Sequence, residues 1–270
     1  MASHNAHYWE DRTSRSKKAQ EHTKEMQKKY SEEIKACVEQ TEVFGPDFHS
    51  SPKRNITAEI AVEDTDSVSS IFEHVDGKTA VLNFASYKNP GGGFLDGSKA
   101  QEECLCHESF LYNVLLTQQD YYEWNNAKKN KGLYCNRALY SPNVLFEHDG
   151  RTVTCDVITC AAPNKSGAQK YNCATEEENR NALQDRIRFI LDIAQEKEAN
   201  TLILGAWGCG VFGQNAKETA ELFKEELLNH PSFRTVIFAV PKSNNPSNSF
   251  TDNYNAFHEV FGTRSLLHSL

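Results

Sequence analysis

The chain alternates between short apolar runs and longer segments in which an apolar residue recurs at every third or fourth position. An almost continuous apolar run bounded by turn residues is typical of a strand that is buried on both faces of a sheet. TAVLNFAS and TLILGAW are runs of this kind, and each ends in a glycine-rich segment. On this pattern we predict strands at residues 55–63, 79–86, 138–148, 152–162, 201–207 and 234–240.

Helical periodicity predicts helices between these strands. The longest follows Thr175, which has capping-box spacing to Glu178. Asp66 or Ser67 is the expected N-cap of a shorter helix, and Asn215 that of another. We predict helices at residues 66–74, 99–118, 176–198, 215–229 and 252–261, with Leu183, Ile187, Leu191 and Ala194 as the core-facing stripe of the longest.

The N-terminal region differs from the rest of the chain. Residues 12–40 are heavily charged and carry one narrow apolar stripe, which predicts a helix that lies on the surface of the body. The stripe consists of Met26, Tyr30, Ile34 and Cys37. Because FGPDFHSSP then breaks the helical pattern, we expect residues 1–45 to form a helical extension packed on a main domain of residues 46–270.

Buried strands that alternate with helices predict an α/β fold with helices on both faces of the sheet. No internal repeat and no linker interrupts the main domain. Two glycine-rich segments follow predicted strands, and open α/β sheets bind their ligands at the carboxyl ends of strands. The sequence therefore places a ligand site at these two loops.

Composition and charge narrow the classes of function. The 270 residues are 39% hydrophobic and 24% charged, with a net charge of −8. Binding to DNA or RNA relies on many Lys and Arg contacts to phosphates, so we expect no direct DNA binding. A ligand with a few phosphates is still compatible, because backbone N–H groups can hold them.

The cysteines and the N-terminus predict a cellular location. None of the eight cysteines forms a C-x-x-C pair or a cluster with zinc-ligand spacing, so reduced thiols in a reducing compartment are expected. The chain begins without an apolar signal-peptide core, and no run approaches the length of a membrane span. We expect a cytoplasmic protein, with access to the nucleus if it is eukaryotic, and no membrane partner.

The segment NPGGGFLDGSKAQEE, residues 89–103, is the first candidate for chemistry. Three consecutive glycines let the backbone approach a ligand closely, and the helix that follows offers unpaired N–H groups, which together suit a diphosphate. The segment is neither a G-x-G-x-x-G fingerprint nor a P-loop. A flexible turn before an ordinary Glu-rich first helical turn explains the same spacing.

The segment GAWGCGVFGQN, residues 205–215, is the second candidate. It places Val211 and Phe212 between glycines at the end of a strand, where an apolar side chain is poorly explained as core. Phe212 is then expected to cover a ligand. The alternative is a phenylalanine tucked under its own loop.

These segments resemble those of a known family. The glycine triplet, the spacer and the Gln-Glu-Glu run of residues 91–103 resemble the signature of poly(ADP-ribose) glycohydrolases. LNFASYKNPGGGF, VITCAAPN and GAWGCGVFGQN match blocks of the bacterial-type members in the expected order. The resemblance implies a macrodomain-like mixed β-sheet that binds ADP-ribose, and an enzyme that hydrolyses poly(ADP-ribose) without a cofactor or a metal ion.

The resemblance also implies roles for individual residues. Glu103 is implied as the catalytic acid, Glu102 as the group that orients the ribose beside the scissile bond, and Gln101 as a support of the loop. Phe212 is implied to pack on the distal ribose. The implied substrate-binding residues are Asn83, Asn89, Gly91, Gly92, Gly93, Phe94, Gln101, Gly208, Cys209, Gly210, Val211, Phe212 and Gly213.

The two glutamates are neighbours, so their side chains should leave a helix about 100° apart. Two carboxyls placed in this way cannot flank one sugar as in ordinary glycosidases. We therefore expect one carboxyl to act first as acid and then as base, with water as nucleophile. The expected partners are poly(ADP-ribose) or ADP-ribosylated proteins, with ADP-ribose as product, released from the chain end. A non-catalytic ADP-ribose reader and a mono-ADP-ribosyl-protein hydrolase are the alternatives.

Overall fold

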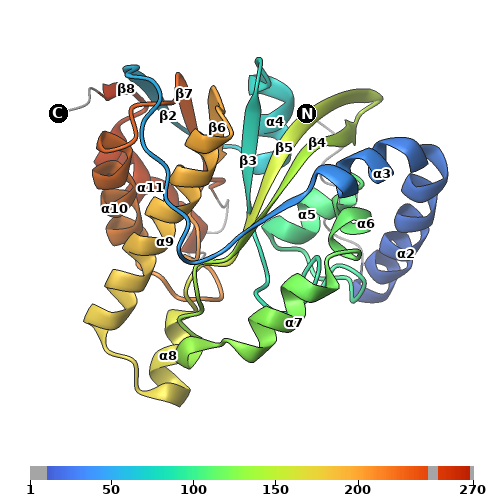
Figure 1. Ribbon diagram of the computed structural model, residues 1–270, viewed down its shortest axis with the longest axis horizontal. Coiled ribbons are helices and arrows are strands. Elements are labelled where there is room, and N and C mark those ends of the chain that lie inside the picture. The colour runs from blue at the N-terminus through green and yellow to red at the C-terminus, as the bar shows by residue number, and fades with distance from the viewer. Residues whose placement is uncertain (1–10, 243–248, 268–270) are drawn as a thin grey trace.

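The computed structural model describes residues 11–242 and 249–267, which form a mixed sheet covered by helices on both faces (Figure 1). Neighbouring strands pair in parallel from β5 to β2, and antiparallel pairs flank them at both edges. The strand order is β1 (Glu42–Phe44), β4 (Ala138–His148), β5 (Arg151–Cys160), β3 (Thr79–Phe84), β6 (Thr201–Leu204), β7 (Thr235–Ala239), β2 (Ala58–Glu63) and β8 (Arg264–Leu267).

Each face of the sheet has its own apolar core, because successive side chains of a strand point to opposite faces. In β3, Ala80 and Leu82 belong to one core and Val81 to the other. The first core packs against α9 (Glu176–Glu196), α10 (Ala216–Leu228) and α11 (Ser249–Phe261). The second packs against α2 (Arg12–Lys29), α3 (Ser31–Gln40), α4 (Ser67–His74), α5 (Gln101–His107), α6 (Leu111–Leu115) and α7 (Gln119–Ala127). The predicted mixed α/β fold with helices on both faces is confirmed.

Several local predictions hold in detail. Asp66 caps α4 by accepting from Ser69 N at 3.0 Å. Thr175 and Glu178 form the predicted capping box of α9. Asn215 caps α10 through Glu218 N. The stripe of α9 predicted to face the core is buried throughout.

Two predicted helices are each broken in two. Residues 12–40 form α2 and α3, because the backbone of Tyr30 leaves the helical region at φ −127° and ψ 36°. Residues 99–118 form α5 and α6, because Ser109 leaves the helix to make an isolated bridge with Phe146 of β4. At Ser109 the bridge to a distant strand replaces the local helical bond. At Tyr30 the backbone bends, although its N–H still donates to Met26 O and its carbonyl still accepts from Ile34 N, both at 2.9 Å.

The structure also contains short strands and helices that the sequence did not predict. The edge strands β1 and β8 have three and four residues, too few for a period to be read. The polar segment after residue 118 contains α7, and the turn at 162–167 opens α8 (Lys165–Asn172), capped by Asn164. Within the described ranges, no helix combines the length and the apolar character that crossing a bilayer requires.

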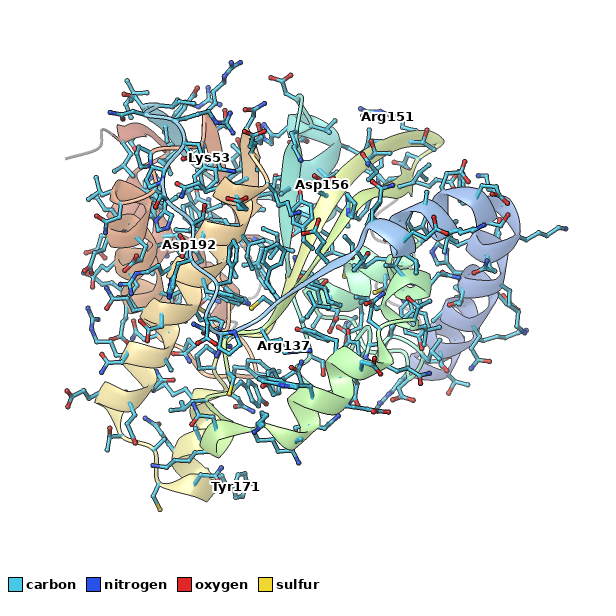
Figure 2. All side chains as sticks on the ribbon, in the orientation of Figure 1. Lys53, Arg137, Arg151, Asp156, Tyr171 and Asp192 are labelled. Carbon is cyan, nitrogen blue, oxygen red and sulfur yellow. The ribbon has the colours of Figure 1, made fainter. Side chains whose placement is uncertain are left out.

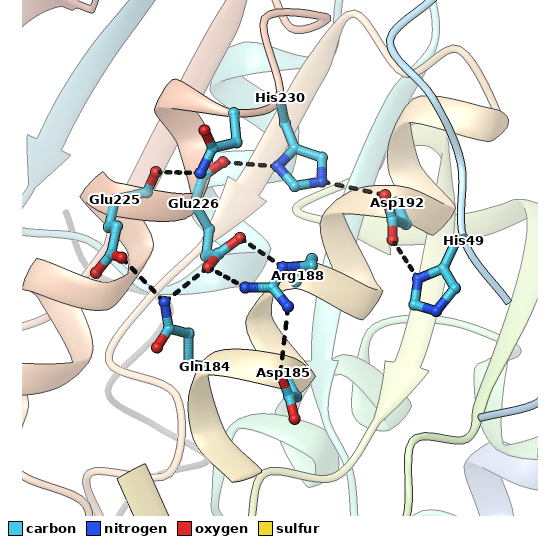
Figure 3. A network of polar contacts seen from close by, with 9 residues as sticks. His49, Gln184, Asp185, Arg188, Asp192, Glu225, Glu226 and His230 are labelled. Carbon is cyan, nitrogen blue, oxygen red and sulfur yellow. Dashed lines mark hydrogen bonds and ion pairs between the residues drawn. The ribbon is translucent and has the colours of Figure 1, made fainter. Parts of the chain in front are cut away.

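A polar network fastens α9 to α10 (Figure 3). Glu226 is 1% exposed and accepts two hydrogen bonds from the guanidinium of Arg188, at 2.9 and 3.1 Å, and one from Gln184 at 2.9 Å. His230 contacts Asp192 at 3.2 Å in the same network. The network lies on the face of the sheet opposite to α5, so it belongs to the scaffold.

Candidate active site

The residues that connect β3 to α5, residues 85–100, are called the glycine loop below. The loop folds back over the first turn of α5. Gly91 and Gly92 adopt φ of +65° and +61°, which favours glycine. A β-carbon placed on Gly92 would lie 2.6 Å from Glu103 Oε1 and 2.9 Å from Glu102 Oε2. Glycine is therefore required here for the backbone to pass beside both carboxyls.

Glu103 is held by the backbone on both sides of the loop. Its Oε1 accepts from Gly93 N and its Oε2 from Ala100 N, both at 2.8 Å. The second bond is the returning half of a capping box; the other half is missing because alanine offers no side-chain acceptor. Glu103 is 6% exposed, and the two hydrogen bonds to its carboxyl fix the position of that group.

Glu102 lies deeper, at 3% exposure, against the end of the sheet. Its Oε2 accepts from Ser86 N at 2.7 Å and its Oε1 from Asn83 Nδ2 at 3.2 Å. Burial raises the pKa of Glu102 to about 8, and the neighbouring charge of Glu103 adds to the rise, although bonds from Ser86, Asn83 and Gly91 oppose it. Around neutral pH this carboxyl is therefore largely protonated.

The expected divergence of the two glutamates is not what the structure shows for their carboxyl groups. Glu103 folds back toward the helix start to reach Ala100, and both carboxyls end beside Gly92. Because both still come from one helix, the conclusion that they do not flank one sugar is unchanged.

Gln101 joins this helix to the end of β3. Its Oε1 accepts from Phe84 N at 2.8 Å, and its Nε2 donates to Leu82 O at 2.8 Å and to Ser67 Oγ at 3.0 Å. The side chain thus makes hydrogen bonds of the kind that a neighbouring strand would make with the carboxyl end of β3. This anchors the first turn of α5 and the two glutamates that follow.

Three predicted ligand-binding residues lie in different surroundings. Phe94 is fully buried and packs on His107 and Tyr112, with ring centroids 4.6 and 4.9 Å apart, so its side chain supports the loop from beneath. Contact of that ring with a ligand would require the loop to open. Asn83 is also fully buried, and its Oδ1 has no partner among the described residues. Asn89 is exposed on the loop.

The segment between β6 and α10, residues 205–215, is called the second loop. Because β6 and β5 flank β3 in the sheet, this loop and the turn after β5 end at the same edge as the glycine loop. Gly213 adopts φ +72°, and a β-carbon there would lie 2.1 Å from Ser166 Oγ. Within the described chain, the N–H groups of Gly210, Val211 and Phe212 have no acceptor, and Val211 is 90% exposed. These donors suit the anionic oxygens of a phosphate.

Other predicted residues of the second loop have structural contacts. Cys209 is buried, with its sulfur 3.6 Å from Trp207 O and from Thr219 Oγ1. Gly208 adopts φ +76°, and a β-carbon there would lie 2.8 Å from Gln214 Cγ. Of the predicted set in this loop, Val211 and Phe212 are therefore the side chains with exposed surface.

An aromatic chain connects the two loops. Tyr87 of the glycine loop stacks on Tyr134, with centroids 4.0 Å apart and planes at 10°, and Tyr134 meets the half-buried Phe212 edge-on at 6.1 Å. Sequence analysis missed both tyrosines. Tyr87 follows a buried strand directly, which is a signal that could have been used, whereas Tyr134 lies in a polar segment that carries no such signal.

A cavity of about 170 Å³ lies beside the glycine loop and was not predicted. It is lined by Pro90, Leu116, Tyr122 and neighbouring residues of α6 and α7. Burial raises the pKa of Tyr122, and the charge of Glu102 raises it further. Its hydroxyl has no partner in the described part of the chain.

A cation lies at the same edge of the sheet. Arg137, labelled in Figure 2, precedes β4 and places its guanidinium 4.3 Å from the ring centroid of Trp124 in α7. Its Nε is buried and has no partner among residues 11–242 and 249–267.

Metal-ligating residues group elsewhere. In the ranges that the structure describes, one set of His, Cys, Asp or Glu has ligand atoms within 4.8 Å of one another: Glu63, Glu73 and His74. They belong to β2 and α4. A larger cavity of about 280 Å³ is lined by Glu73, His74 and the opposite, amino-terminal ends of β2, β6 and β7. The larger cavity and the carboxyl pair are thus at different edges of the sheet.

Comparison with known proteins identifies a family for this chain. The family model described as microbial-type PARG, catalytic domain, matches residues 11–149. No match was found among curated protein sequences.

Solved structures extend the likeness over most of the chain. The poly(ADP-ribose) glycohydrolase from Thermomonospora curvata is 28% identical, with a TM-score of 0.80, over 93% of this chain and 100% of that one. The same enzyme with the inhibitor ADP-HPD gives a TM-score of 0.79. The poly(ADP-ribose) glycohydrolase from Deinococcus radiodurans in complex with ADP-ribose is 29% identical, with a TM-score of 0.73, over 84% of this chain and 96% of that one. Because the family match spans more than half of the chain and includes both predicted catalytic carboxyls, this protein belongs to the microbial-type poly(ADP-ribose) glycohydrolases.

Proposed function

We propose that the chain hydrolyses the ribose–ribose O-glycosidic bonds of poly(ADP-ribose), with Glu103 as the catalytic acid and base. The observation that carries this proposal is the pair of buried carboxyls beside Gly92, one of them held by two backbone N–H groups. The family match and the ADP-ribose complex of a relative support the substrate.

The proposed reaction uses one carboxyl twice. Glu103 gives a proton to the oxygen of the leaving ribose as the glycosidic bond breaks, and an oxocarbenium-like sugar develops. The resulting carboxylate then takes a proton from a water molecule, whose oxygen attacks the anomeric carbon. The proton returns to the enzyme, and the products are ADP-ribose and a polymer shorter by one unit. The diphosphate of the substrate is held by N–H groups of the second loop.

The protonation of the pair bears on the assignment. The resemblance assigns the acid to Glu103, whereas the raised pKa belongs to Glu102. We keep Glu103 as the acid, because it lies against the glycine loop through Gly93, whereas Glu102 lies deeper, bonded to Ser86 and Asn83 at the end of the sheet. Interacting carboxyls titrate as a pair, so the proton held on Glu102 belongs to the pair and not to one residue alone.

The test compares Glu103→Gln with Glu102→Gln on poly(ADP-ribose), with free ADP-ribose measured by chromatography. Loss of a general acid should lower turnover by about 10²–10⁴ in Glu103→Gln, while ADP-ribose binding is kept. Retained hydrolysis in Glu103→Gln contradicts the assignment. A wild-type protein that binds ADP-ribose but hydrolyses no polymer would be a reader, and one active only on mono-modified protein would be a mono-ADP-ribosyl hydrolase.

The proposal includes metal-independent catalysis, which is supported by a carboxyl pair that needs no Lewis acid. It also includes trimming from the free end of the polymer. A net charge of −8 supports this, because a long polyanion threaded through the site would be repelled. A cytoplasmic location is supported by eight free cysteines, of which Cys173 is exposed.

A further inference from the structure

The first turns of α2 lie against the glycine loop, although about 80 residues separate them in the chain. Arg12 Nε donates to Asp96 O at 2.8 Å, Arg15 Nε to Gly97 O at 2.7 Å, and Ser16 Oγ to the carbonyl oxygen of residue 95 at 2.6 Å. Three side chains on one turn of the helix thus hold three successive carbonyl groups of the loop.

The two backbones also touch directly. Gly97 adopts φ +73°, and a β-carbon on it would lie 2.2 Å from Arg12 O and 3.0 Å from Ser16 N. Both neighbours are backbone atoms, which cannot turn aside as a side chain can. A glycine at this position is therefore required for the helix to approach the loop.

The held segment is connected to Glu103 through one residue. The carbonyl oxygen of Gly93 accepts from Asp96 N at 3.1 Å and from Ser98 N at 3.0 Å, which closes the tight turn of residues 93–98. The N–H of the same glycine donates to Glu103 Oε1 at 2.8 Å. A shift of residues 95–97 therefore moves the peptide that orients the carboxyl.

Apolar burial gives α2 little reason to lie here. Ala19 and Met26 are its buried residues, out of the 18 that the helix contains. A surface helix that only covers a core normally buries a broad apolar stripe. The polar contacts at its start are accordingly a large part of what fixes α2, and the family match, which begins at residue 11, includes them.

We propose that Arg12, Arg15 and Ser16 are positioning residues, and that α2 sets the geometry of the glycine loop and, through Gly93, of Glu103. The N-terminal helix then belongs to the structure that orients the catalytic carboxyl. This inference rests on the proposed function of Glu103. The division at residue 45 remains a prediction, and the family match runs across it.

The first test is the triple variant Arg12→Ala, Arg15→Ala, Ser16→Ala. Its control is Lys17→Ala, Gln20→Ala, Lys24→Ala, which removes the same charge from exposed positions of the same helix. Because small misplacements of a catalytic group are costly, we expect kcat to fall about 10- to 100-fold in the first triple, with KM within about threefold. In the control, kcat should match the wild type. Arg15→Lys should keep most of the rate, since an ammonium can also donate to Gly97 O.

The second test is Gly97→Ala, with Gly150→Ala as its control. Gly150 adopts φ +74°, the same strained region, but a β-carbon there would meet nothing within 4 Å. Both variants carry a similar backbone strain, and only Gly97→Ala pushes the helix away. Gly97→Ala should lose turnover, and Gly150→Ala should keep it.

Hydrogen exchange of amides 93–100 provides a readout that does not depend on activity. It should accelerate in the first triple and in Gly97→Ala, and stay unchanged in both controls. Equal kcat in the two triples, or equal exchange in the two, overturns the inference. A wild-type protein without hydrolase activity would overturn the proposed function instead, and the exchange experiment would still decide whether α2 holds the loop.

Discussion

At the scale of single residues, the pKa of Glu102 ties stability to pH. Its pKa is raised in the fold from an ordinary 4.5 to about 8, so the folded protein binds a proton that the unfolded chain releases in this window. The contribution of Glu102 to the free energy of unfolding is then fully present below about pH 4.5. It is lost as pH rises toward 8, by at most about 1.4 kcal/mol per pH unit for one group.

Glu102→Gln removes this titration. We expect the free energy of unfolding, measured by urea at pH 5.5, 7 and 8.5, to fall more steeply with pH in the wild type than in the variant. The slope is the readout, because the amide also changes the bonds to Ser86 and Asn83 and so shifts stability at every pH. Parallel slopes would show that Glu102 is not the group that holds the proton.

Phe212 is the second case at this scale, because a half-buried aromatic can serve either packing or substrate. Its ring meets Tyr134 at one edge, and it belongs to a small cluster with Tyr87. Phe212→Ala should slow polymer turnover strongly, at a cost in stability well below the about 3–5 kcal/mol of a buried Phe→Ala.

The control is Phe223→Ala, which empties a fully buried position of α10 and should destabilise without a specific effect on rate. Melting temperature and turnover are measured for both variants. A large loss of stability in Phe212→Ala with unchanged turnover would mean that the ring serves packing alone.

At the scale of elements, the contact between α9 and α10 depends on a buried charge. Arg188→Ala leaves Glu226, 1% exposed, with Gln184 as its remaining side-chain donor. The side chain of Arg188 is 44% exposed, so water can partly replace it as a partner of Glu226. We therefore expect the free energy of unfolding to fall by about 1–3 kcal/mol, which is below the range for a fully buried pair. Urea unfolding measures it.

The matched comparison is Lys217→Ala, which breaks the exposed pair between α10 and α11 at Glu259. Exposed ion pairs contribute little, so this variant should be close to the wild type. Both variants should keep wild-type turnover, since neither element carries a carboxyl of the site. Equal stability of the two variants would show that burial of Glu226 does not matter.

At the scale of the whole molecule, the acidic surface bears on how polymer is degraded. If the enzyme trims from the free end, long poly(ADP-ribose) should yield ADP-ribose from the first time point while the chains shorten slowly. Gel electrophoresis of the remaining polymer and chromatography of the products measure this together. Early oligomers several units long would show internal cutting.

The glycines, the caps and the presence of the buried strands were predictable because each depends on a few neighbouring residues, whereas the predicted strands at 79–86, 152–162 and 201–207 end two or three residues too late. Asp66, Thr175 and Asn215 cap helices through N–H groups three residues away, and β3 is buried as its apolar run predicts. The order of glycines and Gln-Glu-Glu likewise placed the two carboxyls at a strand end followed by a helix start. These features follow from local backbone geometry, which the sequence alone determines.

Only the tertiary structure decided how these parts meet. Glu102 and Glu103 end beside one glycine, Tyr134 joins the two loops, and Arg15 holds Gly97 from 82 residues away. The predicted helix of residues 99–118 broke at Ser109 for the same reason, since a bridge to Phe146 of β4 forms there. Periodicity and spacing describe neighbours within a few positions, whereas these contacts exist only once the sheet has brought remote segments to one edge.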